Sequence, residues 1–316
     1  MRALIFGGTG QIGRALALEL AQAGWQVDAV VRGRPLAEEV LAAGVQPLAA
    51  GASRAALVVR GYDAVIDTLA FTAADALDLM AEPAGHVTVI STASVYADDQ
   101  GRGFELRDDG FPCYPDPIVE TQAQVPAGPG YSAQKVAMEA ALAGRAAVLR
   151  PGAIHGIGAR HPREWWFVKR ALDGRVRVPV AEGGRSVFQT SSTRGIASLA
   201  RHLLERKITG DFNVADPVAP SVAEIAEAVG QVMGHRFDLR DHEAGQTPWS
   251  VEHPLRLSLA KARATGWGGG PDYADCLPDY VAWMTGHAAD WREVFTVFQH
   301  YGHDPFDYAA EDAALG

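Results

Sequence analysis

Residues 2–13 read RALIFGGTGQIG, and this stretch decides the fold. The apolar run Ala3–Phe6 leads directly into a loop in which Gly7, Gly10 and Gly13 recur at every third position. Glycines at this spacing allow a tight turn, a close approach to a pyrophosphate and close packing of a helix on a strand. The stretch therefore predicts a strand, a phosphate-binding loop and the start of a helix, with an ordinary strand-to-helix turn as the alternative.

The first half of the chain alternates short apolar runs with helical patterns. This alternation predicts an α/β fold, in which a doubly wound parallel sheet is covered by helices. The strands are expected at Ala3–Phe6, Gln26–Val31, Gln46–Leu48, Ala64–Asp67, His86–Ile90 and Ala146–Leu149. The helices are expected at Gln11–Ala23, Ala73–Met80 and Tyr131–Ala143.

After Pro151 the alternation fades, which indicates a second, smaller substrate domain interleaved with the first. We expect a cofactor domain over residues 1–155, with a returning segment near 187–215, and a substrate domain over 156–186 and 216–316. Helices are expected at Arg194–Glu205, Ser221–Met233, Ser258–Ala264, Tyr273–Met284 and Ala288–His300, and a strand at Phe212–Val214. Residues 96–130 lack any period, and such a long loop is usually functional or mobile.

Composition limits the classes of function. The formal net charge is -10, which argues against binding of nucleic acid or of an anionic membrane. Cys113 and Cys276 are the only cysteines and have no partners at metal-ligand spacing, so we expect no metal site, no disulfide framework and a reducing, cytoplasmic setting. No apolar run approaches the roughly 18 residues of a membrane span.

The end of the second predicted strand bears on the cofactor. A dinucleotide-binding unit usually carries an acid there, which binds the adenosine ribose hydroxyls, but this chain has Val31 followed by Arg32 and Arg34. Guanidinium groups bind a 2′-phosphate through paired, charge-assisted hydrogen bonds, and Arg14 could be a third. We therefore expect NADP(H), with NAD(H) less favoured; solvated loop charges are the alternative.

A second motif stands near the middle of the chain, in GYSAQKVAMEAA at residues 130–141. Tyr131 and Lys135 are four residues apart and so lie on one helical face. Upstream, the stretch VISTASVYA places Thr92 just after the fifth strand, at the edge where α/β proteins bind ligands. An ammonium beside a phenol favours the phenolate, which makes a useful base.

Together these motifs resemble the extended short-chain dehydrogenase/reductases, the NAD-dependent epimerase/dehydratase family. The resemblance rests on GGTGQIG, STASVY, YSAQK and LRPGAIHGIG, and it covers most of the chain. It implies a Rossmann-type fold in which Tyr131 is the general acid and base. Lys135 would lower the pKa of Tyr131 and hold the nicotinamide ribose, and Thr92 would bind the substrate oxygen.

The resemblance also assigns binding residues. For the cofactor it implies Gly7, Thr9, Gly10, Gln11, Ile12, Gly13, Arg14, Arg32, Arg34, Leu69, Ala70, Tyr131, Lys135 and Pro151. For the substrate it implies Ser94, Tyr96, His155 and Arg185, the last within a locally basic stretch that suggests an anionic ligand. Ala93 and Ser94 replace the Asp-Glu pair of the family's dehydratases, so elimination chemistry lacks its acid and base.

The leading hypothesis is an NADP(H)-dependent reductase or dehydrogenase acting on a carbonyl or secondary alcohol of a small metabolite. A nucleotide-sugar epimerase with transient hydride transfer is the first alternative, and a non-catalytic, NADP-binding regulator or RNA-associated protein is the second. We expect a homodimer, and a lid at residues 104–117. The substrate, the direction of reaction and the roles of His155, Arg185, His300 and His303 stay open.

Overall fold

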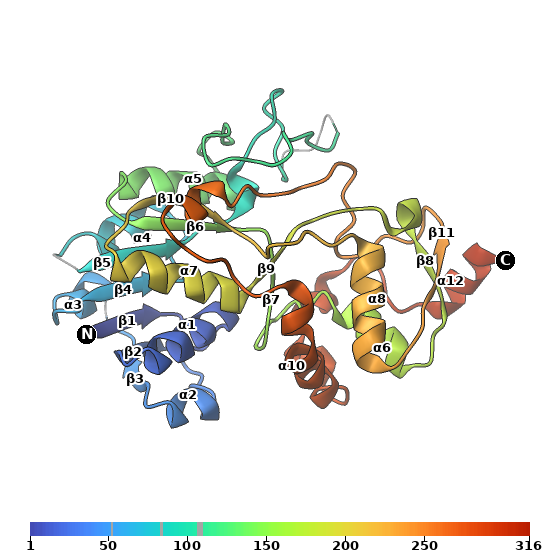
Figure 1. Cartoon of the computed structure of the whole chain (residues 1–316), viewed down its shortest axis with the longest axis horizontal. Coiled ribbons are helices and arrows are strands. Elements are labelled where there is room, and N and C mark those ends of the chain that lie inside the picture. The colour runs from blue at the N-terminus through green and yellow to red at the C-terminus, as the bar shows by residue number, and fades with distance from the viewer. Residues whose placement is uncertain (52, 83–84, 106–109) are drawn as a thin grey trace.

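The computed structural model describes residues 1–51, 53–82, 85–105 and 110–316. A seven-stranded sheet with the strand order β10-β6-β5-β4-β1-β2-β3 forms its larger part, and all of its neighbouring strands are parallel (Figure 1). The strands are β1 Arg2–Phe6, β2 Gln26–Val31, β3 Gln46–Ala49, β4 Ala64–Asp67, β5 His86–Ile90, β6 Ala147–Pro151 and β10 Gly210–Val214. The predicted doubly wound α/β fold is confirmed.

Helices cover both faces of this sheet. Helices α1 (Gln11–Gln22) and α7 (Thr193–Glu205) pack on one face, and α4 (Ala73–Leu79) and α5 (Tyr131–Leu142) on the other. Both faces are covered because both are apolar. In strand β1, alternate side chains belong to different cores: Ile5 packs with α1 and α7, and Leu4 packs with α5. Both side chains are fully buried, as expected for a central parallel strand. Short helices α2 (Glu38–Ala42), α3 (Ala55–Val58) and α9 (Ala260–Ala264) lie at the periphery.

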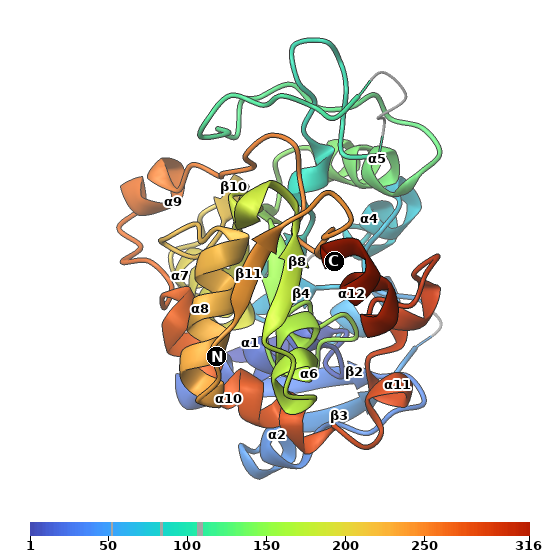
Figure 2. The ribbon, with the colours of Figure 1, turned by 90° about the vertical axis from the view of Figure 1, so that its right-hand side faces the viewer.

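The remaining elements form a second, aromatic-rich unit beside the sheet (Figure 1). Its helices are α6 Trp165–Leu172, α8 Val222–Met233, α10 Tyr273–Gly286, α11 Trp291–Val294 and α12 Tyr308–Leu315. Strand β8 (Arg177–Val180) pairs with β11 (Asp238–Asp241), and Figure 2 shows this pair with α8 on one side and α12 on the other. Strands β7 (Ala153–His155) and β9 (Thr190–Ser192) form a short pair that leads from the sheet into this unit.

The elements predicted from sequence agree with the structure to within two residues at each end, with one exception. The helix expected over Ala288–His300 is wrong, because α11 ends at Val294 and a separate 3-10 helix, Thr296–His300, follows. Phe295 separates them with a non-helical backbone (φ -94°, ψ 59°) and a completely buried side chain. Burial of this ring in the aromatic core therefore outweighs helical continuity.

Residues 96–130 are irregular, as predicted, but one carboxylate organises part of them. Asp98 accepts hydrogen bonds from the backbone N–H groups of Gln100, Arg102 and Cys113, at 2.9–3.0 Å, and forms an ion pair with Arg102. The lid expected at residues 104–117 includes 106–109, which lie outside the described residues. Within the part of the chain that the structure describes, no helix is long and apolar enough to cross a membrane.

Candidate functional site

The glycine loop between β1 and α1 has a geometry that excludes side chains. Gly7 has φ +90°, and a Cβ atom built on it would lie 2.2 Å from Thr68 Oγ1. A Cβ atom on Gly13 would lie 2.1 Å from the carbonyl oxygen of Gly7. Helix α1 therefore packs against the loop as closely as backbone allows. Its first N–H groups, which begin at Gln11, point to the carboxyl edge of the sheet, where a phosphate would bind.

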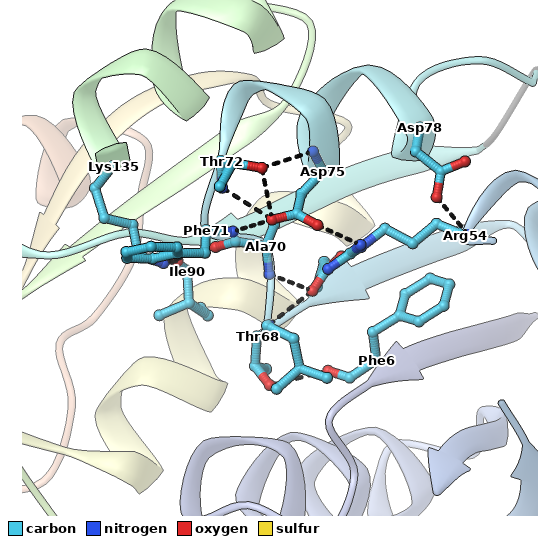
Figure 3. Close-up of polar contacts among 12 residues, drawn as sticks. Phe6, Arg54, Thr68, Ala70, Phe71, Thr72, Asp75, Asp78, Ile90 and Lys135 are labelled. Atoms are coloured by element: carbon cyan, nitrogen blue, oxygen red, sulfur yellow. Dashed lines mark hydrogen bonds and ion pairs between the residues drawn. The ribbon is translucent and has the colours of Figure 1, made fainter. Parts of the chain in front are cut away.

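The loop after β4 forms the neighbouring wall of this edge. Asp67, the last residue of β4, accepts hydrogen bonds from the backbone N–H groups of Leu69 (2.7 Å) and Ala70 (2.8 Å). Arg54 forms ion pairs with both Asp67 and Asp75, the latter at 2.7 Å (Figure 3). These contacts hold the two residues that the resemblance assigns to cofactor binding, Leu69 and Ala70, in a fixed turn beside the glycine loop.

Lys135 crosses from α5 to the ends of two strands. Its ammonium donates hydrogen bonds to the carbonyl oxygens of Ala70 (2.7 Å) and Ile90 (2.9 Å) (Figure 3). The side chain is 6% exposed, and burial lowers the pKa of Lys135 to about 8, with partial compensation from nearby carboxylates such as Asp67. The ammonium is thus fixed between β4 and β5, at the carboxyl edge of the sheet.

Tyr131, Thr92 and two serines bring hydroxyl groups together beside Lys135. Thr92 Oγ1 donates to Ser94 Oγ at 3.1 Å, and Ser132 Oγ donates to the same atom at 3.0 Å. Tyr131 is the first residue of α5, and its ring centroid lies 5.6 Å from that of Phe71. The structure therefore brings the three predicted catalytic residues to one edge of the sheet.

The protonation of Tyr131 differs from the expectation. Although Tyr131 is 45% exposed, neighbouring groups displace enough water for burial to raise the pKa of its phenol; a hydrogen bond with Thr92 lowers the pKa in part, and the charge of Glu105 raises it further. The ammonium of Lys135 is directed at two carbonyl oxygens, and burial, Thr92 and Glu105 are the influences that set the direction of the Tyr131 pKa. The lowering of that pKa by Lys135 stays a prediction.

A cleft of about 510 Å³ opens over these groups. Five residues assigned from sequence lie on its wall, namely Gln11, Thr92, Ser94, Tyr131 and Pro151. The opposite wall includes Ile154, His161, Arg163, Phe188 and Leu255. Of these, His161, Arg163 and Leu255 fall in the predicted substrate domain, but none is assigned to the site from sequence as an individual residue. The cleft thus lies between the carboxyl edge of the parallel sheet and the aromatic-rich unit, where ligands of α/β proteins generally bind.

The end of β2, where the adenosine ribose is expected, carries no acid. Arg32 and Arg34 are exposed on a turn that Gly33 makes with φ +72°. Within the described residues neither arginine has an ion-pair partner. Arg14 behaves differently, because its Nε forms a 2.5 Å ion pair with Glu39 at the start of α2. Two guanidinium groups are therefore free at this point, whereas the third is already paired.

Three residues assigned to substrate binding do not line the cleft. Tyr96 is completely buried and donates its hydroxyl to Asn213 Oδ1 at 2.6 Å. His155 is 1% exposed, and its Nε2 lies 2.6 Å from Asp216 Oδ2. Arg185 is exposed beyond the 3-10 helix Ala181–Gly184. Burial and their own partners hold Tyr96 and His155 elsewhere, and Arg185 lies on the surface outside the cleft, so in this structure Ser94 alone of the four substrate residues lines the cleft.

The sequence did not reveal the polar core behind Thr92. Arg150 donates to Glu139 at 2.6 Å and to Asp211 at 3.0 Å. Glu139 also accepts from the hydroxyl of Ser91, the residue before Thr92. Because Glu139 lies on α5, this network joins the helix that begins with Tyr131 to the end of β5 and to β6. The only sequence signal was a set of charged residues within otherwise apolar elements.

Several known structures share the fold of this chain. No protein-family model matches the chain, and no curated protein matches it significantly. A candidate epimerase from Burkholderia cenocepacia J2315 has a TM-score of 0.71 at 22% identity, with 90% of this chain and 98% of that chain covered. The UDP-glucose 4-epimerase of Stenotrophomonas maltophila, with bound NAD and formylated UDP-arabinopyranose, has a TM-score of 0.69 at 20% identity, with 90% and 98% covered.

A third structure extends this agreement. The Thermus thermophilus UDP-glucose 4-epimerase complex with NAD has a TM-score of 0.65 at 20% identity, with 90% of this chain and 99% of that chain covered. At these identities the likeness establishes the fold alone: the chain shares the α/β fold of these epimerase structures, the Rossmann-type fold that the resemblance predicted. Within the described residues, no group of three or more His, Cys, Asp or Glu side chains is arranged to hold a metal ion.

Proposed function

We propose that the chain catalyses hydride transfer between a nicotinamide dinucleotide and a carbonyl or secondary alcohol carbon of a small molecule, with Tyr131 as general acid and base. The shared cleft carries the proposal: Tyr131 and Thr92 line it together with Gln11, the first residue of the helix after the glycine loop. A proton donor, a second hydroxyl and a phosphate-binding helix N-terminus around one space are what this reaction requires.

The protonation of Tyr131 sets the order of events. Because burial raises the pKa of the phenol, Tyr131 keeps its proton at neutral pH and donates it to the substrate oxygen that gains charge as hydride reaches carbon. Thr92 donates a hydrogen bond to the same oxygen and stabilises that charge. In the reverse direction the Tyr131 phenolate accepts the proton of the alcohol.

The residues around the cleft fit a dinucleotide. The free N–H groups at the start of α1 would hold the pyrophosphate, the turn at Leu69 and Ala70 would contact the dinucleotide beside them, and the Lys135 ammonium would reach the nicotinamide ribose. The dinucleotide supplies or accepts the hydride. The close packing of Gly7 and Gly13 supports this fit, because any Cβ atom there would displace the backbone that forms the cradle.

Two outcomes of the same chemistry are each supported by a specific observation. The three similar structures reported above are described as epimerases, and two of them contain NAD, which favours transient hydride transfer and a change of stereochemistry in a nucleotide sugar. Arg32 and Arg34, which are free at the end of β2, favour NADP(H) and net reduction or oxidation. We place epimerisation first, because net reduction rests on the cofactor argument alone.

The test is an assay of the purified chain beside its Tyr131→Phe variant, with nucleotide sugars followed for epimers and with aldehydes and ketones followed for loss of NADPH or NADH. We expect activity in one series and a loss of about 10²–10⁴-fold in the variant, the usual contribution of a general acid. Unchanged turnover in Tyr131→Phe would contradict the proposal. Tight dinucleotide binding without turnover in either series would instead support a non-catalytic binding protein.

The assembly state forms a separate part of the proposal. A homodimer through α5 and the neighbouring α4 agrees with Leu77 of α4, which is 59% exposed, and with the small side chains of α5. Sedimentation of the wild-type chain and of a Leu77→Arg variant tests it. A dimer that the variant disrupts is expected, and a wild-type monomer would contradict it.

A further inference from the structure

Arg163 lies on the wall of the cleft without a carboxylate partner. Its Nη1 makes one long hydrogen bond, 3.5 Å to the carbonyl oxygen of Ile154, and its guanidinium carbon lies 5.7 Å from the ring centroid of Phe188. The buried Nε has no hydrogen-bond partner. Within the described residues, no Asp or Glu oxygen lies within ion-pair distance of this guanidinium. Arg163 is thus a cation that the fold leaves largely unsatisfied.

Other arginines of low exposure in this chain form ion pairs with carboxylates. Arg150 is paired with Glu139 and Asp211, Arg170 with Glu311, and Arg54 with Asp67 and Asp75. The rule they follow is general, since a charge removed from water without a partner destabilises the fold strongly. Arg163 departs from that rule at the wall of a cleft, where a ligand could supply the missing anion.

The charge of Glu164 acts on Arg163, but within the described residues no nearby group forms an ion pair with it. Glu164 follows it in the chain, but its carboxylate is turned into the core, where it accepts from Tyr273 at 3.1 Å. Glu105 lines the same cleft and accepts from the backbone N–H of Ser132 at 2.8 Å. His161 stays uncharged, because burial, together with the charge of Arg163, lowers its pKa to about 3. Among the described residues that line this wall, Arg163 is therefore the one positive charge.

We infer that Arg163 binds an anionic group of the substrate, a carboxylate or a phosphate ester, while the carbonyl or alcohol carbon lies at Tyr131 in the same cleft. A guanidinium offers a planar fork of N–H donors that matches both anions. Ile154, Phe188 and Leu255 make the wall beside it apolar, so the anion and the reacting oxygen are the polar ends of the ligand. This inference rests on the proposed hydride chemistry only for the position of the reacting carbon.

One residue of the basic sequence stretch is placed to bind an anion in the cleft. Residues 160–185 contain seven arginines and lysines, yet among the described residues Arg163 is the cation of this stretch that lines the cleft. Arg160, three residues earlier, is exposed and outside the cleft. The pair Arg163 and Arg160 therefore provides a test residue and a matched control with the same change of charge.

The experiment is isothermal titration calorimetry of the full-length chain, loaded with the dinucleotide that it binds, against three probes: D-glucuronate, D-glucose 6-phosphate and neutral D-glucose. We expect saturable binding of at least one of the two anions, and the one preferred identifies the anion as carboxylate or phosphate. Arg163→Gln should weaken this binding about tenfold or more, the contribution of a charge-assisted hydrogen bond to a buried site. Arg160→Gln should leave it within about twofold.

Binding without turnover separates this inference from the proposed function. Tyr131→Phe should bind the anionic probe as the wild type does, even though its turnover is lost. Equal binding of the anion by Arg163→Gln and wild type, equal binding of glucose and the anions, or no saturable binding of either anion would each overturn the inference and leave the Tyr131 proposal standing.

A thermal unfolding measurement distinguishes a loss of binding in Arg163→Gln from a loss of stability. Because the guanidinium lacks a carboxylate partner, Arg163→Gln should unfold at the same temperature as the wild type or at a higher one, as is common where a site sacrifices stability for binding. Addition of the anionic probe should raise the Tm of the wild type and not that of the variant. A Tm clearly lowered by the substitution would show a structural role for Arg163 and overturn the inference.

Discussion

The two units of this molecule bury different kinds of side chain. In the sheet, aliphatic residues such as Leu4, Ile5 and Leu16 fill the space between strands and helices. In the second unit the core is aromatic: the ring centroids of Trp165 and Phe295 are 5.1 Å apart, and those of Trp166 and Phe167 are 4.8 Å apart. The cleft lies between these units, and each supplies one wall.

The difference explains how each wall is positioned. Parallel strands share one carboxyl edge, so Thr92 after β5, Ala70 after β4 and Pro151 at the end of β6 meet there by topology alone. The other wall depends on contacts between distant segments, such as the bridge between Phe188 and Leu255. On the proposed function, the sheet would position the catalytic groups, whereas the aromatic unit would position the groups that select a ligand.

The largest expected effect concerns a buried pair in the second unit. His155→Gln should destabilise the fold by about 3–5 kcal/mol, because it leaves the carboxylate of Asp216 buried without its partner. Burial alone would lower the pKa of His155, but the charge and hydrogen bond of Asp216 outweigh it and raise the pKa. The pair therefore stabilises the fold fully only between the ordinary pKa of Asp216, 3.8, and about pH 6.5. The contribution of His155 is lost as pH rises through its folded pKa, and that of Asp216 is lost as pH falls through its own.

Urea unfolding at acidic and alkaline pH measures this loss, and His300→Gln, at an exposed histidine, is the control. We expect the free energies of unfolding of wild type and His155→Gln to differ more at acidic pH than at alkaline pH. A stability equal to that of the wild type at both pH values, with weakened substrate binding instead, would return His155 to the substrate site.

The next effect concerns the sheet unit. Gly13→Ala should lower the free energy of unfolding by about 3 kcal/mol, since overpacking at this level is costly, and should also weaken dinucleotide binding. The cause is the 2.1 Å approach of the new Cβ atom to the carbonyl oxygen of Gly7. Gly128→Ala, with no heavy atom within 4 Å of its Cβ position, is the control. Wild-type behaviour of Gly13→Ala would show that α1 can move away from the loop without consequence.

A pH effect at Lys135 has the opposite direction from that at His155. Its pKa is lowered from 10.5 to about 8 by burial, so between these values the unfolded chain binds a proton that the folded chain does not, and stability rises with pH. Relative to Lys135→Met, the wild type should gain about 2–3 kcal/mol between about pH 7 and pH 10. A difference independent of pH, in the same urea experiment, would mean that the carbonyl oxygens of Ala70 and Ile90 keep the ammonium charged.

The smallest effect concerns the two free arginines after β2. If they bind a 2′-phosphate, the double variant Arg32→Ala/Arg34→Ala should bind NADPH about 10- to 100-fold more weakly, the value of one or two charge-assisted hydrogen bonds, and should bind NADH as the wild type does. Arg60→Ala, at another exposed arginine of the same unit, should change neither. A preference of the wild type for NADH, measured by fluorescence titration, would contradict the expectation of NADP(H) that rests on these two arginines.

The sequence predicts the sheet unit better than it predicts the contacts between distant segments. The glycine loop, the strand ends and the Tyr131–Lys135 pair could be predicted because period, turn chemistry and parallel topology determine them locally. The burial of Tyr96 and His155 could not, because Asn213 and Asp216 lie about sixty or more residues away and no period connects them. The unpaired state of Arg163 is likewise a property of its surroundings, which the sequence of a basic stretch does not contain.

We propose above all that the carboxyl edge of the sheet binds a nicotinamide dinucleotide against Tyr131. The most direct measurement is a fluorescence titration of the full-length chain with NADH and with NADPH, with Gly13→Ala and Gly128→Ala in parallel. We expect saturable binding of one dinucleotide per chain, weakened in Gly13→Ala and retained in Gly128→Ala. No saturable binding of either dinucleotide to the wild type, or equal binding by both variants, would contradict it.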